Sequence, residues 1–215
     1  MPGFLNRFFG GHRTQAGDVH LREIIDHFNE AAADEENFPS TIDPRIYHVQ
    51  LILEHFGDLN GRRVLDDGSG KGRFARVLKE RHPEVSIFAF DLAEAMLRRV
   101  PPGILPCGGS MTSLPFRSGV FDCAYATESL EHAVDIEAAV SEMCRVLKPG
   151  GRIVIIDKNL EQWGRLATPA WERWFKRGEI ERLLKRQCRE VSSRPISYGE
   201  DVAPDGLFLA WLATK

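Results

Sequence analysis

The feature that most limits how this chain can fold is a glycine-rich turn, "VLDDGSGKGRF", at Val64–Phe74. A short apolar run leads into the turn, and a run with helical spacing of apolar residues follows it. Glycine recurs here as D-x-G-x-G-x-G, and because glycine has no Cβ the backbone can turn tightly and approach a ligand closely. A strand, such a turn and a helix in this order predict the first unit of a nucleotide-binding α/β fold.

Short apolar runs recur along the chain and alternate with helical stripes, which is the pattern of an α/β layered fold. Runs that are apolar on both faces are typical of strands in a buried parallel sheet. The predicted strands are Arg62–Asp67, Val85–Phe90, Val120–Ala126, Gly151–Asp157 and, from a weaker signal, Ile104–Gly109. Two strand-like runs near the C-terminus, 189–197 and 206–215, are expected to pair antiparallel.

The composition narrows the class of protein. The chain has 215 residues, 43% of them hydrophobic, a formal net charge of −3 and four cysteines. The cysteines are scattered without a C-x-x-C pair, which argues against a zinc knuckle and against a secreted disulfide framework. No apolar run reaches the roughly 18 residues of a membrane span. These features predict a cytoplasmic enzyme.

The charge around the turn indicates which nucleotide binds there. Asp66 and Asp67 start the turn, and Asp91 ends the second predicted strand, 19 residues beyond Gly72. A carboxylate at about this spacing binds ribose hydroxyls in nucleotide-binding units. A dinucleotide would bring its doubly negative pyrophosphate against the two aspartates, whereas S-adenosylmethionine carries a net positive charge. The residues therefore favour S-adenosylmethionine as the cofactor.

Four stretches resemble, in order and spacing, the core motifs of class I S-adenosylmethionine-dependent methyltransferases of the small "type 11" kind. They are "VLDDGSGKGRFARVLKE", "FAFDLAEAMLRRV", "SMTSLPFRSGVFDCAYATESLEH" and "EMCRVLKPGGRIVIID". The resemblance covers roughly residues 47–160 and implies a Rossmann-like seven-stranded sheet of order 3-2-1-4-5-7-6, with strand 7 antiparallel and helices on both faces. We expect a single domain, with a helical cap at 1–60, a cofactor-binding core at 61–160 and a substrate-side segment with a terminal hairpin at 161–215.

The resemblance also implies roles for individual residues. Asp66, Gly68 and Gly70 correspond to the binders of the methionine end, Asp91 to the ribose ligand, and Leu92 to its apolar neighbour on adenine. Ser110 and Met111 stand where the family usually has an acid followed by an apolar residue, so a neutral hydroxyl replaces the charged acceptor of the adenine amino group. Thr127 completes the predicted cofactor-binding set.

The sequence offers two candidates for proton transfer, Glu128 and His132. Glu128 follows the fourth predicted strand, at the edge where ligands bind in open α/β sheets. His132 has a competing interpretation as a packed, hydrogen-bonded histidine. Glu128, Glu131 and His132 also reproduce an E-x-x-E-H spacing that resembles a divalent-metal site in ubiquinone-biosynthesis O-methyltransferases; the less specific interpretation, without metal, is the one we favour.

The acceptor pocket is expected to use residues outside the core motifs, namely Tyr47, His48 and the aromatic segment 163–175. The alternative for that segment is a helix whose buried stripe is Trp171, Trp174 and Phe175. A second expectation concerns Asp67 and Lys71, which are unusual at their loop positions and are expected either to pair with each other or to act on the ligand.

Three classes of function remain open. We favour a methyltransferase that acts on an O, N or C atom of a small-molecule acceptor. A nucleic-acid methyltransferase is less well supported, because only "WFKRGEIERLLKRQCR" is locally basic and acids are interspersed in it. The third class is a non-catalytic module that binds S-adenosylmethionine. The N-terminal "MPGFLNRFFGGHR" combines apolar residues with basic ones and is expected to be a lid-forming or disordered terminus, with weak peripheral membrane contact as the alternative.

Overall fold

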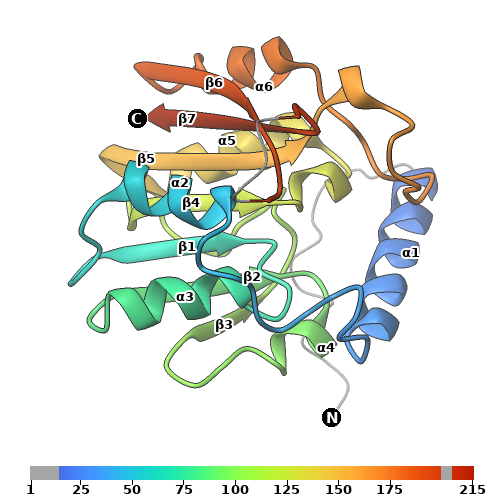
Figure 1. Cartoon of the computed structure of the whole chain (residues 1–215), viewed down its shortest axis with the longest axis horizontal. Helices are drawn as coiled ribbons and strands as arrows, with labels where there is room; N and C mark the ends of the chain where they lie inside the picture. The colour runs from blue at the N-terminus through green and yellow to red at the C-terminus, as the bar shows by residue number, and fades with distance from the viewer. Residues whose placement is uncertain (1–14, 200–204) are drawn as a thin grey trace.

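The computed structural model of the protein describes residues 15–199 and 205–215. Within these ranges seven strands form one sheet of order β3-β2-β1-β4-β5-β7-β6 (Figure 1). The strand bounds are β1 Arg63–Asp67, β2 Ser86–Asp91, β3 Leu105–Gly108, β4 Phe121–Thr127, β5 Leu147–Lys158, β6 Glu190–Ile196 and β7 Phe208–Thr214. β7 runs antiparallel to both β5 and β6, whereas the other pairs are parallel. This arrangement confirms the predicted sheet, including the order of its strands.

Helices cover both faces of the sheet, as predicted. The helix bounds are α1 Gln15–Ala31, α2 Tyr47–Phe56, α3 Arg73–Arg81, α4 Glu94–Leu97, α5 Ile136–Val146 and α6 Arg177–Leu184. The buried side chains of α2 and α3 belong to one hydrophobic cluster, and those of α5 and α6 belong to another on the opposite face. Among the described residues, no helix has the length and apolar character needed to cross a bilayer.

The central strands are buried on both sides because their side chains alternate between the two clusters. On β1, Val64 packs into the cluster with α2 and α3, while its neighbour Leu65 packs into the cluster with α5. Neither side chain is exposed to solvent. This double burial is the reason the strands read as continuous apolar runs in the sequence. The predicted weak strand is the edge strand β3, where Leu105 is 48% exposed.

β5 begins at Leu147, four residues before the predicted start at Gly151. The helix α5 ends at Val146, so Leu147 belongs to the strand and not to the helical stripe. The pairing of β4 with β5 shifts register between Phe121 and Cys123, which accommodates the turn-prone Lys148–Gly151 residues within the strand. The proline and the glycines at 149–151 therefore lie within β5 and do not delay the start of the strand.

The helix α1 lies beyond the carboxyl ends of the parallel strands, at the right of Figure 1. Its Phe28, together with the adjacent Ala32, packs against Met96 of α4 in a small separate cluster. The backbone amide of Ala95 donates to Asn29 Oδ1 at 2.9 Å, which fixes α1 to the start of α4. The chain before β1 therefore places a helix over the sheet edge at which parallel strands bind ligands.

The aromatic segment 163–175 is not helical, so the prediction of a helix with a buried stripe was wrong. Trp174 and Phe175 are buried all the same, and Phe175 makes an isolated bridge to Asn159 just after β5. Trp163 is 60% exposed and meets Trp174 edge-on, with ring centroids 5.2 Å apart. The i, i+3, i+4 spacing failed here because an extended segment hydrogen-bonded to the end of β5 buries Trp174 and Phe175, while Trp171 is only partly buried. Phe175 N donates to Lys158 O at 3.0 Å.

Candidate active site

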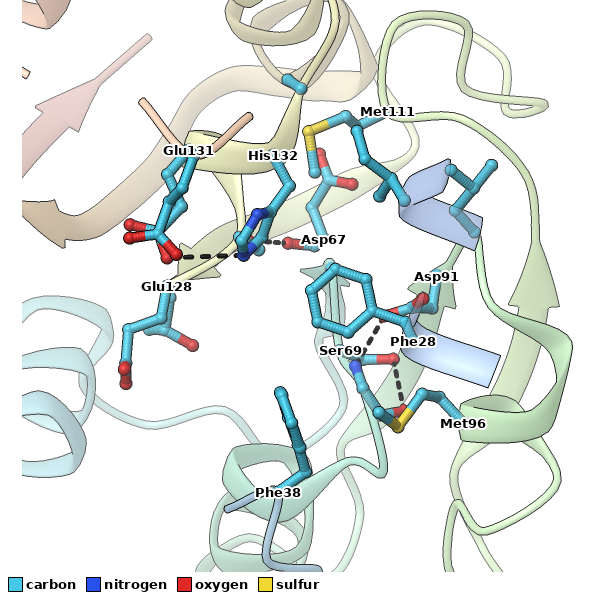
Figure 2. A pocket seen from close by; sticks show the side chains of 18 of the residues that line it. Phe28, Phe38, Asp67, Ser69, Asp91, Met96, Met111, Glu128, Glu131 and His132 are labelled. Atoms are coloured by element: carbon cyan, nitrogen blue, oxygen red, sulfur yellow. Dashed lines mark hydrogen bonds and ion pairs between the residues drawn. The ribbon is translucent and has the colours of Figure 1, made fainter. Parts of the chain in front are cut away.

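A cavity of about 700 Å³ opens at the carboxyl ends of β1, β2, β4 and β5 (Figure 2). This volume is in the range of sites that hold a drug-sized ligand. Nearly all of the predicted site residues line it: Gly68, Gly70, Asp91, Leu92, Ser110, Met111, Thr127, Glu128 and His132. Asp66 does not line the cavity, whereas Asp67 does. Asp66 was expected to bind the methionine end of the cofactor. Because it does not line the cavity, that role stays a prediction.

The glycine turn takes the conformation that its sequence predicts. Gly68, Gly70 and Gly72 have φ angles of +82°, +53° and +74°, a region that side-chain-bearing residues rarely adopt. A Cβ on Gly68 would lie 2.3 Å from the Cβ of Ser129, so the turn and the segment after β4 approach each other too closely for any side chain there. The amides of Gly68 and Ser69 both donate to Phe90 O, which fixes the turn to the end of β2.

Asp91 holds the turn from the neighbouring strand. Its Oδ2 accepts from Gly70 N at 2.7 Å, and its Oδ1 accepts from Ala93 N at 2.8 Å. These two bonds orient the carboxylate at the cavity wall, since Asp91 is one of the lining residues. Burial raises the pKa of Asp91, although the backbone hydrogen bonds from Ala93 and Gly70 counteract the rise. Each oxygen keeps a further lone pair for a ligand hydroxyl.

Three carboxyl groups, from Asp66, Asp67 and Asp91, gather around the turn. Burial raises the pKa of Asp66 to about 7, although the nearby Tyr125 hydroxyl acts in the opposite direction. The pKa of Asp67 is raised well above its usual value, first by burial and then by the charges of Asp66 and Asp91. The structure gives Asp67 Oδ1 no hydrogen-bond partner among the described residues. A positively charged ligand would relieve this concentration of buried negative charge.

The substitution Asp67→Asn is expected to stabilise the unliganded protein at pH 8 by about 1–3 kcal/mol, because the amide removes the cost of burying an ionisable carboxyl beside Asp66 and Asp91. An acid whose pKa is higher in the folded than in the unfolded state binds more protons when folded, so stability falls as pH rises above the unfolded pKa of 3.8. The neutral amide does not titrate in this range, so the variant does not lose stability in this way as pH rises. Melting temperatures of both proteins between pH 5 and pH 8 should diverge as pH rises, and a variant that is less stable at every pH would contradict this interpretation.

Lys71 does not pair with Asp67, so that expectation was wrong. Its Nζ lies 2.8 Å from Glu35 Oε1 and donates to Asp34 O at 2.9 Å. The partners come from the segment after α1, 36 and 37 residues earlier in the chain. The hydrogen bond with Lys71 lowers the pKa of Glu35 to about 2. Lys71 thus connects the glycine turn to the N-terminal cap.

Ser110, where the resemblance has an acid, uses its hydroxyl within its own loop. Ser110 Oγ is 2.8 Å from Thr112 Oγ1 and accepts from Thr112 N at 3.3 Å. The hydroxyl retains capacity for one more acceptor contact. Met111 points into the same part of the pocket as Asp67 (Figure 2), and its Cε is 3.6 Å from the position of a Cβ on Gly68. The wall that is predicted to receive adenine therefore combines a thioether with neutral and acidic oxygen atoms.

Glu128 is the only described non-glycine residue with a positive φ, at +52°. Such a backbone usually costs about 1–3 kcal/mol and concentrates at functional sites. Its Oε1 accepts from Arg73 Nη2 at 3.0 Å, and Arg73 Nη1 is bonded to the hydroxyl of Tyr198 at 3.1 Å. Arg73 immediately follows the glycine turn, so this pair joins the end of β4 to the start of α3. The strained turn directs the carboxylate to the cavity wall.

His132 is held in a short 3₁₀ helix, Leu130–His132, after β4. Burial and, to a smaller extent, the nearby Lys158 lower its pKa to about 3, so the imidazole is neutral at physiological pH. Its Nε2 is 3.4 Å from Glu131 Oε1. The ring also meets Phe28 edge-on, with centroids 4.9 Å apart. The histidine is packed as the simpler interpretation held, yet it also lines the cavity.

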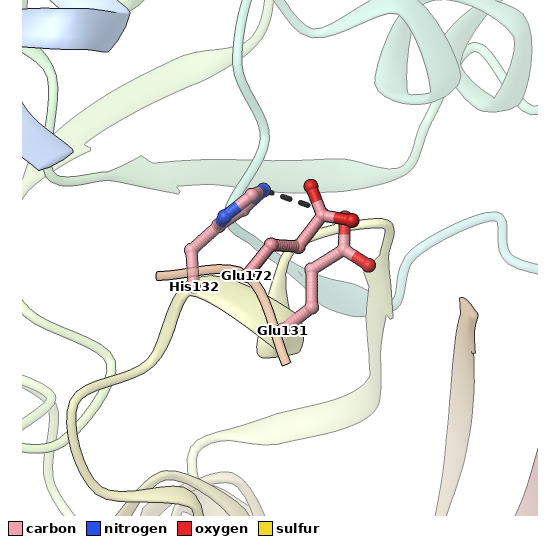
Figure 3. A group of neighbouring side chains, drawn as sticks. All are labelled: Glu131, His132 and Glu172. Carbon is pink, nitrogen blue, oxygen red and sulfur yellow. Dashed lines mark ion pairs between the residues drawn. The ribbon is translucent and has the colours of Figure 1, made fainter. Parts of the chain in front are cut away.

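Glu128, Glu131 and His132, whose spacing resembles a metal site in the interpretation that we did not favour, do not form one group in the structure. Glu131 and His132 lie close to Glu172, and one ligand atom from each falls within 4.8 Å of the others (Figure 3). Glu128 is absent from this group and pairs with Arg73 instead. Lys158, the last residue of β5, contacts both glutamates, with Nζ 2.5 Å from Glu131 Oε1 and 3.0 Å from Glu172 Oε1.

The acceptor side of the cavity differs from the predicted one. Tyr47 and His48 do not line it: Tyr47 is 37% exposed on the surface, and His48 is fully buried between α3 and the C-terminal strands. The segment 163–175 contributes Glu172 and residues 166–169 to the lining, but not its tryptophans or Phe175. Residues that the sequence analysis did not single out also line the cavity, namely His27, Phe28, Phe38 and Lys158. The one available signal was the charged pair Asp157-Lys158 directly after a predicted buried strand, at the edge where ligands bind.

Comparisons with known proteins agree with this geometry. Residues 65–155 match the protein family described as "Methyltransferase domain". A demethylmenaquinone methyltransferase of Paenarthrobacter aurescens is 31% identical over 152 residues, which are 69% of this chain and 57% of that protein. A malonyl-[acyl-carrier protein] O-methyltransferase of Geobacter sulfurreducens is 29% identical over 139 residues, 62% of this chain and 52% of that protein. The chain thus spans little more than half the length of these relatives.

A solved structure shares the fold. The chain matches an S-adenosylmethionine-dependent methyltransferase from Aquifex aeolicus with a TM-score of 0.65 and 18% identity, over 88% of this chain and 97% of that one. At this identity the likeness concerns the fold alone. The strand order, the glycine turn and the family match together show that the chain carries a methyltransferase domain of the class I S-adenosylmethionine-dependent family.

Proposed function

We propose that this chain is an enzyme that transfers the methyl group of S-adenosylmethionine to an O, N or C atom of a small-molecule acceptor. The observation that carries the proposal is the glycine turn bordered by Asp66, Asp67 and Asp91, two of which line the cavity. Buried acid suits a ligand with a net positive charge and disfavours a pyrophosphate. The relatives named as a demethylmenaquinone methyltransferase and a malonyl-[acyl-carrier protein] O-methyltransferase support the reaction class while leaving the acceptor atom open.

The residues at the turn would position the cofactor. The carboxylate of Asp91, held by two backbone amides, is placed to accept from the ribose hydroxyls, and Leu92 and Met111 supply apolar surface for the base. The first backbone amides of α3, which follow the turn and have no acceptor within the helix, can receive the single carboxylate of the methionine end. A sulfonium is already an activated methyl donor, so holding donor and acceptor in line contributes most of the acceleration, about 7–11 kcal/mol in favourable cases.

Two cavity residues are proposed to assist the acceptor. Glu128 stays ion-paired with Arg73 and is placed to accept a proton from an acceptor hydroxyl or amine that comes within hydrogen-bond reach. His132, neutral because of its burial, can accept a hydrogen bond but is a weak base. Between the two, the structure favours Glu128 as the proton acceptor.

Isothermal titration calorimetry with S-adenosylmethionine and S-adenosylhomocysteine tests the proposal directly. We expect both to bind at one site per chain, and we expect radiolabel from the methyl donor to reach a small-molecule fraction when the enzyme is incubated with a metabolite extract. Absence of heat from either ligand would contradict the cofactor assignment. Binding of both ligands with label transferred only to added RNA would move the protein to the class of nucleic-acid methyltransferases.

A further inference from the structure

A cluster of charged side chains lies on the cavity wall, apart from the glycine turn. It consists of Lys158 at the end of β5, Glu131 and His132 in the short helix after β4, and Glu172 in the extended segment before α6. All four line the cavity. We call them the Lys158 centre. Figure 3 shows the side chains of Glu131, His132 and Glu172 converging on one point.

The centre is held in place by the backbone around it. Asp157 is fully buried; its Oδ2 accepts from Glu131 N at 3.1 Å and its Oδ1 accepts from Lys158 N at 2.9 Å. Arg173 N donates to Glu131 O at 3.0 Å, which fixes the segment carrying Glu172. Glu172 Oε1 also accepts from Trp174 Nε1 at 3.1 Å. Three separate parts of the chain therefore deliver these charges to one place in a fixed geometry.

The centre has unused hydrogen-bonding capacity, and its Lys158 and Glu172 line the cavity. The ammonium of Lys158 has three donors, and the structure gives it two acceptors, Glu131 Oε1 and Glu172 Oε1. The Glu131 side chain is only 1% exposed, and its Oε2 has no partner among the described residues. A buried polar atom without a partner is costly, and a buried ion cluster gives little net stability in return. A ligand that supplies the missing partners accounts for the arrangement.

The charges of the centre select among ligand groups. An acceptor ammonium would meet Lys158, and a carboxylate or phosphate would meet Glu131 and Glu172. A divalent ion bound by Glu131, His132 and Glu172 would lie beside the Lys158 ammonium, which already contacts both carboxylates. The two positive charges would repel each other strongly in this poorly solvated wall. A neutral hydroxyl accepts one hydrogen bond and donates another, so it satisfies the free donor of Lys158 and a carboxylate oxygen at the same time.

The pKa values of the acids around Lys158 are consistent with a neutral ligand. Burial, together with the carboxylate of Asp157, raises the pKa of Glu131 well above its usual value, and burial raises the pKa of Asp157 as well. Acids with raised pKa values carry less negative charge, which reduces the excess of negative charge around Lys158. The aromatic side chains of Phe28 and Phe38 lie on the same cavity wall and provide a surface for a ring that carries the hydroxyl (Figure 2).

We propose that the Lys158 centre binds a hydroxyl group of the methyl acceptor, so that the acceptor is a neutral hydroxylated ring compound. This inference rests on the proposed methyl-transfer function and specifies the acceptor end of the same cavity. Lys158 donates to the hydroxyl oxygen, and Glu172 accepts the hydroxyl hydrogen.

Four benzene derivatives that differ in one substituent test this assignment: phenol, toluene, benzylamine and benzoate. Their affinities are measured by saturation-transfer NMR on the protein saturated with S-adenosylhomocysteine. We expect phenol to bind about fivefold or more tightly than each of the other three, the gain of roughly one hydrogen bond. Lys158→Met and the nearly isosteric Glu172→Gln should each remove this preference. Lys148→Met is the matched control, because Lys148 pairs with Asp122 outside the cavity and the preference should persist.

The controls separate the failure modes. Equal binding of toluene and phenol, tighter binding of benzylamine or benzoate, or an unchanged phenol preference in both variants would overturn the inference. Binding of Mn²⁺ that Glu172→Gln abolishes, seen as paramagnetic broadening, would overturn it in favour of a metal site. If Lys158→Met does not fold, Glu172→Gln carries the test. Failure of S-adenosylhomocysteine to bind the unaltered protein would instead reject the proposed function itself.

Discussion

Replacing Gly68 with alanine is expected to abolish measurable binding of S-adenosylhomocysteine and to lower the melting temperature by roughly 5–15 °C. The new Cβ would lie 2.3 Å from Ser129 Cβ and 2.6 Å from Ser129 Oγ, at a φ of +82°. A left-handed backbone costs a side-chain-bearing residue about 1–2 kcal/mol, and overpacking adds about 1–3 kcal/mol. In a domain of this size each kcal/mol shifts the melting temperature by about 2–4 °C. Calorimetry and thermal denaturation give the two readouts.

Gly70→Ala is the matched control for this substitution. Gly70 also has a positive φ, +53°, but a Cβ there would meet no atom within 4 Å. Only the backbone strain applies, so the loss of stability should be about 1–2 kcal/mol. If both variants lose the same stability, the close approach of Ser129 to the turn has no energetic weight, and the explanation given for Gly68 is incorrect.

The second large effect is expected from Asp91→Ala, which should weaken S-adenosylhomocysteine binding at least about 100-fold. The carboxylate accepts from Gly70 N and Ala93 N, and a hydrogen bond to a charged group contributes about 1.5–3 kcal/mol. Loss of the carboxylate releases the glycine turn and also removes the group that is proposed to bind the ribose hydroxyls. A 100-fold change corresponds to about 2.7 kcal/mol, and titration calorimetry measures it.

Two further variants interpret the result for Asp91. Asp91→Asn keeps one acceptor oxygen and should lose less affinity than the alanine variant. Asp122→Ala removes a carboxylate that accepts from Arg63 N at 2.9 Å, at the start of β1 and away from the cavity. It should leave cofactor affinity unchanged. Equal losses in Asp122→Ala and Asp91→Ala would mean that general destabilisation, and not the ligand contact, causes the effect.

Comparison of Asp66 with Asp67 shows how far spacing alone predicts a site. Both follow the same apolar run, but successive strand residues point to opposite faces, so only one of the two can reach the cavity. The structure selects Asp67 and turns Asp66 toward Tyr125. The motif located the turn to within a residue, while the pleat of β1 decided which carboxylate faces the ligand.

The acceptor end was much less predictable. Glu172 and Lys158 are 14 positions apart in the sequence, in a segment whose aromatic spacing indicated a helix. Their contact depends on hydrogen bonds of an extended segment to the end of β5 and to Glu131 O. The partner of Lys71 came from the cap before β1, likewise beyond the reach of a local pattern.

By itself the sequence determined the alternation of strands and helices, the strand order through the resemblance, and the glycine turn with Asp91 after it. These follow from local rules: apolar runs buried on both faces, and backbone angles that only glycine adopts without strain. The tertiary structure alone decided which side chains form the acceptor wall, because Phe28, Glu131, Lys158 and Glu172 come from four separate segments. Their juxtaposition arises from packing at the carboxyl edge of the sheet, and no periodicity in the chain encodes it.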